Sequence, residues 1–335
     1  MMRRLIPVLL LCALLLSGCA ANGVQPENGY APPESERLVV YTSHKEEIYR
    51  PIIREFEQRT GIWVQLETGG TNEMLEQIAL ESDYPQADLM FGGGVESLQA
   101  FSEYFDDMPS GLDDNLLACY MLAGSKWLPF SSLPVVLIYN QKLTGDDPPT
   151  GWASLLDSRW KGKIAFARPD VSGSSYTALA TLLQALPGTD EALMEAFYRN
   201  LDGKLLEGSG LVVGAVSDGD SLIGVTLEET ARKGIAAGED IAVVYPEEGT
   251  SDVPDGIALV MGCAHRDNAV RFIAFVLGTD VQKRLSTDFY RRSVRADLAE
   301  PARDFRIIDY DIVWASGHKA ELLAAWSLLT EEGAP

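Results

Sequence analysis

The sequence predicts a two-lobed α/β protein in which each lobe is a mixed sheet flanked by helices and two hinge strands join the lobes. Strand-like and helix-like patterns alternate from Leu38 onward, which is typical of this class. About 300 residues follow the N-terminal region, enough for two domains of ordinary size. Segments rich in Gly, Pro and polar residues interrupt the pattern near 140–149 and 248–254. We therefore expect 38–137 and 255–335 to form lobe 1 and 138–254 to form lobe 2.

The N-terminus has the order of a secretion signal. Arg3 and Arg4 precede the apolar run Leu5 to Leu16, which is shorter than the roughly 20 residues needed to cross a bilayer. The run ends at Leu-Ser-Gly-Cys19, which resembles a bacterial lipobox, so we expect a signal peptide over 1–18 and acylation of Cys19. A plain signal peptide, with no role for Cys19, is the alternative. The polar segment 19–37 lacks a hydrophobic period and is expected to be a disordered tether.

Charge and cysteine content restrict the class of partner. The chain carries a net charge of −22, which repels nucleic acid and keeps the surface soluble. The same charge disfavours a small anion at long range, so an anion site must rest on local donors. Of the four cysteines, Cys12 belongs to the expected signal peptide and Cys19 to the expected lipid anchor, which leaves Cys119 and Cys263, and these match no metal spacing. A disulfide between them and two buried thiols are both open.

The first part of lobe 1 reads as a βαβαβ run. Leu38–Tyr41 is predicted to be a buried strand, and an amphipathic helix follows and stops at Thr60-Gly61. Pro51 lies inside that helix, where we expect a kink or a restart. The next expected elements are a strand over Ile62–Leu66, a helix over Thr71–Ser82 and a strand over Ala87–Phe91.

Lobe 2 is expected to begin after the apolar run Leu133–Tyr139. Its predicted strands are Lys163–Ala167, Leu211–Val216, Leu222–Leu227 and Ile241–Val244, and its predicted helices are Ser174–Leu186 and Asp190–Asn200. The chain is then predicted to return to lobe 1 with a strand, Ile257–Met261, and three helices, Asp267–Leu277, Val281–Ser286 and Lys319–Thr330.

Three loops of lobe 1 are candidate ligand contacts, because loops at strand ends line the ligand crevice of open α/β sheets. Ser43 follows the first strand, and its spacing to Glu46 also fits a helix cap. Thr71 follows Gly69-Gly70 after the second strand, where glycines let backbone N–H groups approach a ligand. Gly94 ends a run of three glycines after the third strand, which could equally be a turn without a ligand.

Lobe 2 carries the most informative loop, a hydroxyl-rich segment that opens a helix. Unpaired N–H groups and serine hydroxyls at a helix N-terminus suit phosphate, phosphonate, sulfate or carboxylate. Two carboxylates, Asp218 and Glu228, would suit sugar hydroxyls or an ammonium group at the far end of the ligand, or simply form a solvated acidic turn. The expected anion contacts in this loop are Ser172, Gly173, Ser174 and Ser175, and the alternative is a Ser-rich helix cap with nothing bound.

A series of short motifs along the mature chain, taken in order and spacing, is specific enough to suggest a family. The motifs are Leu38–Ser43, Phe56–Gly61, Gly69–Thr71, Ala87–Leu89, Ser172–Leu179, Gly249-Thr250 before Val253–Gly256, and Asn268–Phe275 with Val281-Gln282. With them the chain resembles the bacterial substrate-binding proteins of ABC transporters, type II fold, in the branch that groups ferric-ion, phosphonate and sugar-phosphate binders. The resemblance implies a transport role without catalysis: a monomer that closes on a small anion and delivers it to an ABC permease and ATPase. No cofactor is expected, and the lipid would hold the protein on the extracytoplasmic face of the cell membrane.

Three alternatives stay open. Ferric binders of this branch carry adjacent tyrosines late in the chain, whereas here one tyrosine precedes two cations, Tyr290-Arg291-Arg292, so no metal site is expected. A ferric-iron-binding protein remains the first alternative, and a sensor that presents its ligand to a membrane histidine kinase is the second. An enzyme is the third, although the three histidines lack zinc spacing and neither a nucleophile elbow nor a P-loop is present.

Overall fold

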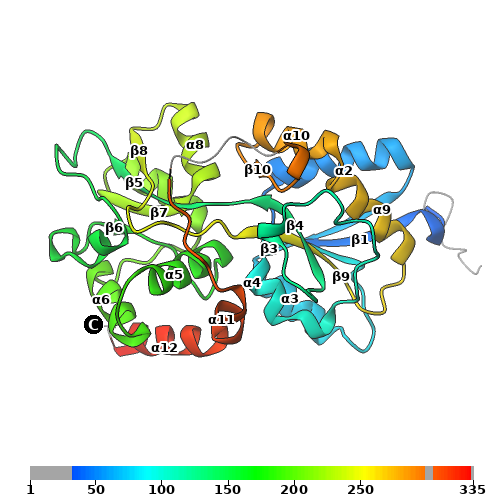
Figure 1. Cartoon of the computed structure of the whole chain (residues 1–335), viewed down its shortest axis with the longest axis horizontal. Helices are drawn as coiled ribbons and strands as arrows, with labels where there is room; N and C mark the ends of the chain where they lie inside the picture. Colours follow the sequence, from blue (N-terminus) through cyan, green and yellow to red (C-terminus); the bar gives the residue numbers. More distant parts are fainter. Residues whose placement is uncertain (1–31, 299–304, 333–335) are drawn as a thin grey trace, which may run out of the picture.

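The structure is a computed structural model of the whole chain and describes residues 32–298 and 305–332. Cys19 and the signal peptide lie outside the described residues. The end of the expected tether is ordered, because a 3-10 helix spans Glu34–Glu36 and the first strand begins at Arg37. Two lobes lie side by side, each built on one sheet (Figure 1).

Lobe 1 is built on a six-stranded mixed sheet with the order β10-β4-β9-β3-β1-β2. β1 runs parallel to β2 and β3, whereas β9 runs antiparallel to β3 and β4. Its strands are β1 (Arg37–Thr42), β2 (Trp63–Thr68), β3 (Leu89–Gly94), β4 (Trp127–Ser132), β9 (Pro254–Leu259) and β10 (Arg292–Ser293). Its helices are α2 (Glu46–Thr60), α3 (Thr71–Leu80), α4 (Val95–Ala100), α9 (Arg266–Val276) and α10 (Thr279–Asp288).

Lobe 2 is built on a four-stranded sheet with the order β6-β7-β5-β8. β5 runs antiparallel to β7 and β8, and β6 runs parallel to β7. Its strands are β5 (Val135–Asn140), β6 (Ile164–Ala165), β7 (Ile223–Leu227) and β8 (Ile241–Val244). The helices packed on it or beside it are α5 (Gly173–Ala185), α6 (Asp190–Leu201), α7 (Val212–Ser217), α8 (Glu228–Ala237), α11 (Ile312–Gly317) and α12 (Lys319–Glu332).

Local sequence explains why α2 forms where it does. Ile48, Ile52 and Phe56 recur every four residues and are all buried against the sheet of lobe 1. Gly61 ends the helix in the left-handed conformation, with φ of 74°, and its N–H donates to the Glu57 carbonyl. The helix runs unbroken through Pro51, so the expected restart there is wrong.

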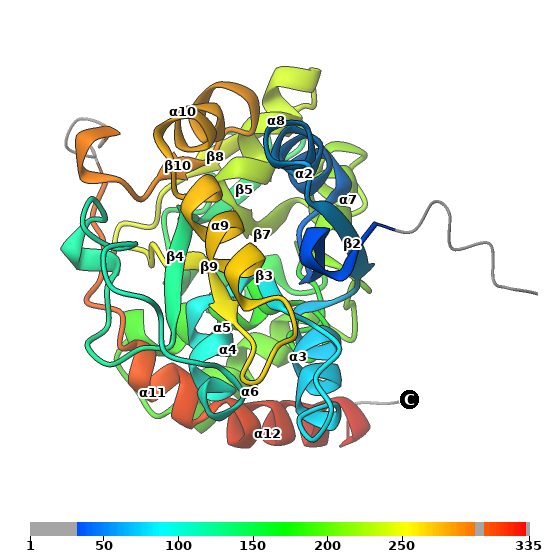
Figure 2. The ribbon, with the colours of Figure 1, turned by 90° about the vertical axis from the view of Figure 1, so that its right-hand side faces the viewer.

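The chain crosses between the lobes three times. β4 ends in lobe 1 at Ser132 and β5 begins in lobe 2 at Val135, so the first crossing precedes the predicted one. The second joins β8 to β9. The third follows β10 and leads to α11 and α12, which lie together along one side of the molecule (Figure 2).

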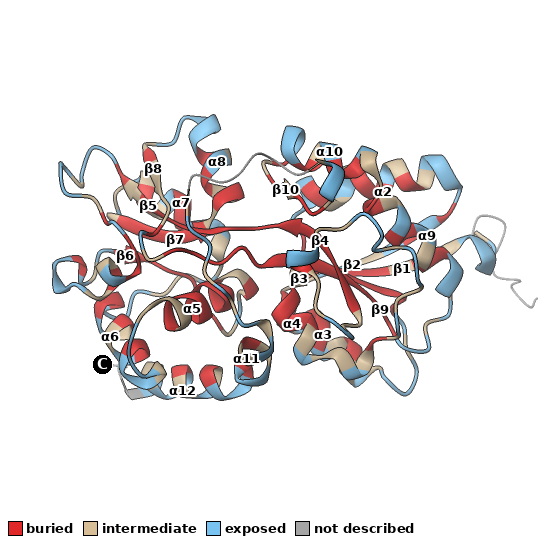
Figure 3. Ribbon diagram, in the orientation of Figure 1, coloured by how far each residue is buried: buried red, intermediate tan, exposed pale blue. Residues whose placement is uncertain are grey.

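Two predictions about elements are wrong. The run Leu211–Val216 is helical: a 3-10 turn leads into α7, whose Val212, Val213 and Val216 face the core of lobe 2 as on a helix. The C-terminal helix was assigned to lobe 1, but Leu322 and Trp326 of α12 are buried in the core around α5 and α6 of lobe 2. The burial colouring shows the same inward face of α12 (Figure 3).

Candidate ligand site

A cavity of about 340 Å³ lies between the lobes, and residues of both lobes line it. Lobe 1 contributes the loops that follow β1, β2 and β3, and lobe 2 contributes the N-terminal turns of α5 and α8. The carboxyl ends of the three parallel strands of lobe 1 therefore point at lobe 2, as expected for ligand sites on open α/β sheets.

The lobe 1 wall contains all three residues predicted there, Ser43, Thr71 and Gly94. Ser43 does not cap α2, because Lys45 is the N-cap residue and no side chain caps this helix. Thr71 is the first residue of α3, after Gly70 as N-cap. The alternative interpretation, that Ser43 caps the helix, is therefore wrong.

Glycine is required beside Thr71 on steric grounds. Gly93 has φ of 85°, and a Cβ added there would lie 2.6 Å from the Thr71 Cγ2 atom. A Cβ on Gly173 of lobe 2 would lie 3.0 Å from the Thr71 Oγ1 atom. The two lobes thus come together closely at Thr71, with only backbone opposite it.

The lobe 2 wall is formed by the start of α5. Ser172 is the N-cap residue and its Oγ accepts from the Ser175 N–H at 3.4 Å, while its hydroxyl lies 3.1 Å from the Ser174 Oγ. Ser172, Gly173 and Ser174 line the cavity. Ser175 is buried and does not line the cavity, so its prediction as a ligand contact is not supported by the cavity lining; its N–H donates back to the Ser172 cap. The first N–H groups of α5 have no partner within the helix, as at any helix N-terminus.

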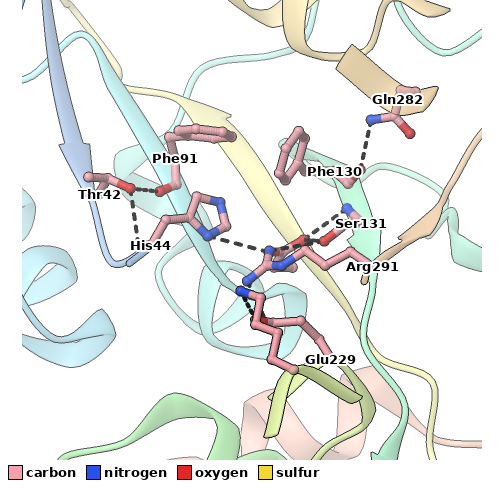
Figure 4. A network of polar contacts seen from close by, with 10 residues as sticks. Thr42, His44, Phe91, Phe130, Ser131, Glu229, Gln282 and Arg291 are labelled. Carbon is pink, nitrogen blue, oxygen red and sulfur yellow. Dashed lines mark hydrogen bonds and ion pairs between the residues drawn. The ribbon is translucent and has the colours of Figure 1, made fainter. Parts of the chain in front are cut away.

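The remaining wall is a buried cluster of charges around Arg291. Its Nη1 donates to Asp255 Oδ2 at 2.5 Å and to Ser131 Oγ at 3.1 Å, and its Nη2 lies 3.3 Å from Glu229 Oε2 (Figure 4). Lys233 also binds Glu229, at 2.7 Å. The guanidinium is thus shared between two carboxylates, one from each lobe.

Burial and neighbouring charges shift the titration of this cluster in different directions. Burial raises the pKa of the Asp255 carboxyl, against the lowering effect of Arg291. Burial also acts to raise the pKa of Glu229, but Arg291 and Lys233 outweigh it and the pKa falls below its usual value. Burial acts to lower the pKa of Arg291, and the two carboxylates reverse this, so the arginine stays charged.

His44 completes the wall as a neutral side chain. Its ring lies 4.5 Å from the ring of Phe91 and 5.4 Å from that of Phe130 (Figure 4). Burial, together with the charge of Arg291, lowers its pKa well below the usual value. Among the described residues, the His44 Nε2 and Arg291 Nε atoms are buried without a hydrogen-bond partner, so polar capacity remains at this wall.

Besides Ser175, two more predicted contacts lie outside the cavity. Asp218 follows the last residue of α7 and does not line the cavity. Glu228 is buried, but it binds Arg292 and Tyr245 outside the cavity. Glu228 was the predicted contact, but Glu229 lines the cavity instead, because adjacent residues at a helix start point in directions about 100° apart.

A second polar cluster, which we call the rear cluster, lies behind the cavity and joins the lobes. Thr177 of α5 lines the cavity and donates to the buried Glu96 of α4. Lys319, the first residue of α12, donates to Asn72 at 2.8 Å and to Ser97 at 2.7 Å. Burial lowers the pKa of Lys319 to about 8.

Within residues 32–298 and 305–332, no group of three or more His, Cys, Asp or Glu side chains could hold a metal ion. No helix in those ranges is both long and apolar enough to span a bilayer. Cys119 and Cys263, both within them, are not joined in a disulfide, and Cys119 is exposed rather than buried.

Two lobes joined by crossing strands around an interlobe cavity define a solute-binding protein of the type II periplasmic-binding class. The model of the family "Bacterial extracellular solute-binding protein" matches residues 86–314, and the chain belongs to this family. Membership implies an extracellular or periplasmic place, a small-molecule ligand and the membrane components of an ABC transporter as partners. The predicted fold and the solute-binding function are thereby confirmed.

Individual relatives are distant but cover most of the chain. "Iron uptake protein A1" of Synechocystis is 26% identical over 85% of this chain and 82% of its own. "Putative 2-aminoethylphosphonate-binding periplasmic protein" of Salmonella typhimurium is 24% identical over 72% and 73%. Among solved structures, the periplasmic binding protein AfuA from Actinobacillus pleuropneumoniae, with fructose-6-phosphate bound, superposes with a TM-score of 0.79 at 22% identity, over 88% of this chain and 98% of the other.

Proposed function

We propose that this protein captures a small phosphorylated or phosphonate anion between its lobes for an ABC importer. One observation carries the proposal: the N-termini of α3 from lobe 1 and α5 from lobe 2 open onto the same cavity. Hydroxyls of Ser43, Thr71, Ser172 and Ser174 accompany them. Unpaired N–H groups and the positive end of each helix dipole favour a dianion with several acceptor oxygens.

The net charge of the protein makes such local donors necessary. At −22 the chain repels an anion at long range, so the affinity must come from contacts inside the cavity. Backbone N–H groups supply these contacts without adding a charge that the neighbouring carboxylates would neutralise. The arrangement therefore combines an acidic surface with an anion site.

The opposite wall would contact the rest of the ligand. Asp255, Glu229 and Arg291 offer both acceptors and donors, which suits hydroxyl groups, and the carboxylates also suit an ammonium group. The relatives support both kinds of ligand, the one with an ammonium group and the one with hydroxyl groups. One relative is called a 2-aminoethylphosphonate-binding protein, and the structure of another holds fructose-6-phosphate.

Ferric iron is the second candidate, and it is favoured by the name of the Synechocystis relative. Hard Fe³⁺ needs anionic oxygen ligands. The two carboxylates in the cavity are both bonded to Arg291, whose positive charge would lie beside the metal. The observed ion pairs therefore support an anionic ligand over a bare cation.

Calorimetric titration of the protein with phosphorylated and phosphonate compounds tests the proposal, alongside ferric citrate. Ser172→Ala is the informative variant and Thr189→Ala its matched control, because both residues are N-caps of lobe 2 helices and only Ser172 lines the cavity. Each loss of a cap should cost about 1 kcal/mol of stability. Only Ser172→Ala should weaken binding of the anion. Tight binding of iron with no binding of any phosphorylated compound would show that the ligand class is wrong.

Membrane attachment is a separate proposal and rests on the lipobox-like sequence before Cys19. Acylation would hold the domain at the extracytoplasmic face of the cell membrane through the polar segment that follows. Metabolic labelling with palmitate should mark the wild-type protein and leave Cys19→Ala unlabelled. An unlabelled wild-type protein in the culture medium would contradict this proposal.

A further inference from the structure

Two adjacent arginines of lobe 1 face two adjacent glutamates of lobe 2. Arg291 binds Glu229 inside the cavity, at 3.3 Å. Arg292 binds Glu228 through two hydrogen bonds, Nε to Oε2 at 2.8 Å and Nη2 to Oε1 at 2.8 Å. Since successive side chains of an extended segment point to opposite sides, one arginine reaches the cavity and the next one leaves it.

The outer pair, Arg292 and Glu228, is well enclosed. The Glu228 side chain is 1% exposed and that of Arg292 is 12% exposed. Tyr245 donates to the same carboxylate, and its ring stacks on Phe305 at 4.1 Å, while the Arg292 guanidinium lies 5.7 Å from the Phe305 ring. Because little water reaches this bidentate ion pair, solvent screening weakens it less than it weakens a surface ion pair.

The surroundings also keep Glu228 ionised. Burial acts to raise its pKa, but hydrogen bonds from Arg292 and Tyr245 outweigh burial and lower the pKa below its usual value. Removing one partner would leave the other charge buried without a counter-charge, which is costly, whereas removing both charges together leaves nothing unpaired.

The pair joins elements that carry the cavity wall. Glu228 is the first residue of α8, directly before Glu229, and Arg292 begins β10, directly after Arg291. The elements that carry the pair, α8 and β10, lie on the upper side of the molecule in Figure 1, opposite α11 and α12, where the rear cluster joins the lobes. The pair also spans the β4–β5 crossing, because Arg292 pairs with Ser132 of β4 and the Glu228 N–H donates to the Pro134 carbonyl, so a rotation of one lobe against the other there changes its geometry.

We propose that Arg292 and Glu228 are positioning residues for ligand binding, whose ion pair holds the lobes together beside the cavity without touching the ligand. The inference rests on the proposed function for its ligand. Without the pair, β10 no longer holds α8, so the contact between Arg291 and Glu229 is no longer fixed and separated lobes are favoured. Ligand dissociation then accelerates by a similar factor for every ligand that the cavity accepts.

A double-mutant cycle with Arg292→Met, Glu228→Gln and the double variant tests the pair. Binding of fructose 6-phosphate and of 2-aminoethylphosphonate is measured by stopped flow and calorimetry. Arg292→Met should weaken binding about tenfold, mainly through faster dissociation, and the double variant should recover most of that loss. Arg295→Met is the matched control, because Arg295 forms a two-bond pair with Asp297 within lobe 1. It should bind as the wild type does.

A ligand-free measurement separates this inference from the proposed function. Spin labels at two exposed positions, Arg54 of lobe 1 and Glu195 of lobe 2, report the distance between the lobes in a background with all four native cysteines replaced by serine. Arg292→Met should lengthen and broaden that distance, and the double variant should restore it. If the wild type binds neither compound, the proposed function fails while the distances still test the pair. Equal distances and additive effects in all variants would overturn the inference.

Discussion

Replacing Lys319 by methionine should remove a specific part of the pH dependence of stability. The ammonium group is buried and faces Glu96, Glu76 and the ring of Tyr176, while Tyr310 lies buried next to Glu96 and Tyr176. Burial lowers its pKa from 10.5 to about 8. Lysine in the unfolded chain therefore holds its proton more firmly than Lys319 does in the folded protein.

The sign and size of the effect follow by linkage. Between pH 8 and 10.5 the unfolded chain binds more protons than the folded protein, so the free energy of unfolding rises with pH there. The contribution is complete above the unfolded pKa and is lost as the pH falls through the folded one. A pKa shift of this size corresponds to about 3 kcal/mol in the free energy of unfolding. Most of it, about 2 to 3 kcal/mol, should be gained between pH 7 and pH 10.

Urea unfolding at several pH values between 7 and 10 measures the effect. The wild type should gain about 2 to 3 kcal/mol relative to Lys319→Met over this range. Lys142→Met is the control, because Lys142 is an exposed lysine paired with Asp240 within lobe 2, and its pH profile should follow the wild type. Parallel profiles for the wild type and Lys319→Met would refute the reasoning, since the ammonium group would then not be buried.

Three further changes test the cavity and the C-terminal helix, each by urea unfolding. Gly93→Ala should lower the free energy of unfolding by about 2 kcal/mol and weaken anion binding, because the new Cβ meets Thr71. Its control is Gly238→Ala, which has a similar φ of 91° but open space around it. This control should lower the free energy of unfolding by about 1 kcal/mol and leave binding unchanged. Asp255→Ala should cost about 3 to 5 kcal/mol by leaving Arg291 buried without its closest partner, against less than about 1 kcal/mol for the exposed Asp297→Ala. Trp326→Ala should cost about 3 to 5 kcal/mol and the exposed Leu328→Ala less than about 0.5 kcal/mol, and equal effects would contradict the packing of α12.

Most elements of lobe 1 could be predicted because their patterns are local. The strand at Leu38 and the helix ending at Gly61 carry their own apolar period and stop signal. β4 was missed because Pro129 and two serines interrupt its pattern, and proline is rare in a strand with neighbours on both sides. A register shift between Pro129 and Ser131 against β9 accommodates it, which only the paired strand reveals.

The residues of the candidate site also divide into those with a local sequence signal and those that meet only in the folded protein. Ser43, Thr71 and Ser172 were predictable, since each lies where a strand ends or a helix begins. Asp255 and Glu229 were not chosen as contacts, because they lie 36 and 62 positions from Arg291 and meet it only after the lobes are assembled. An apolar stripe likewise predicts that α12 packs, but not against which sheet.

The burial of Trp326 also has a consequence for biosynthesis. Lobe 2 needs α12 to complete its core, and lobe 1 needs α9 and α10, so neither has all its core residues until the last part of the chain has been made. A polypeptide delivered from its N-terminus therefore lacks a complete core in either lobe until α9, α10 and α12 have followed. An extended chain of this kind is what a secretion channel can thread, and folding can then finish on the far side of the membrane.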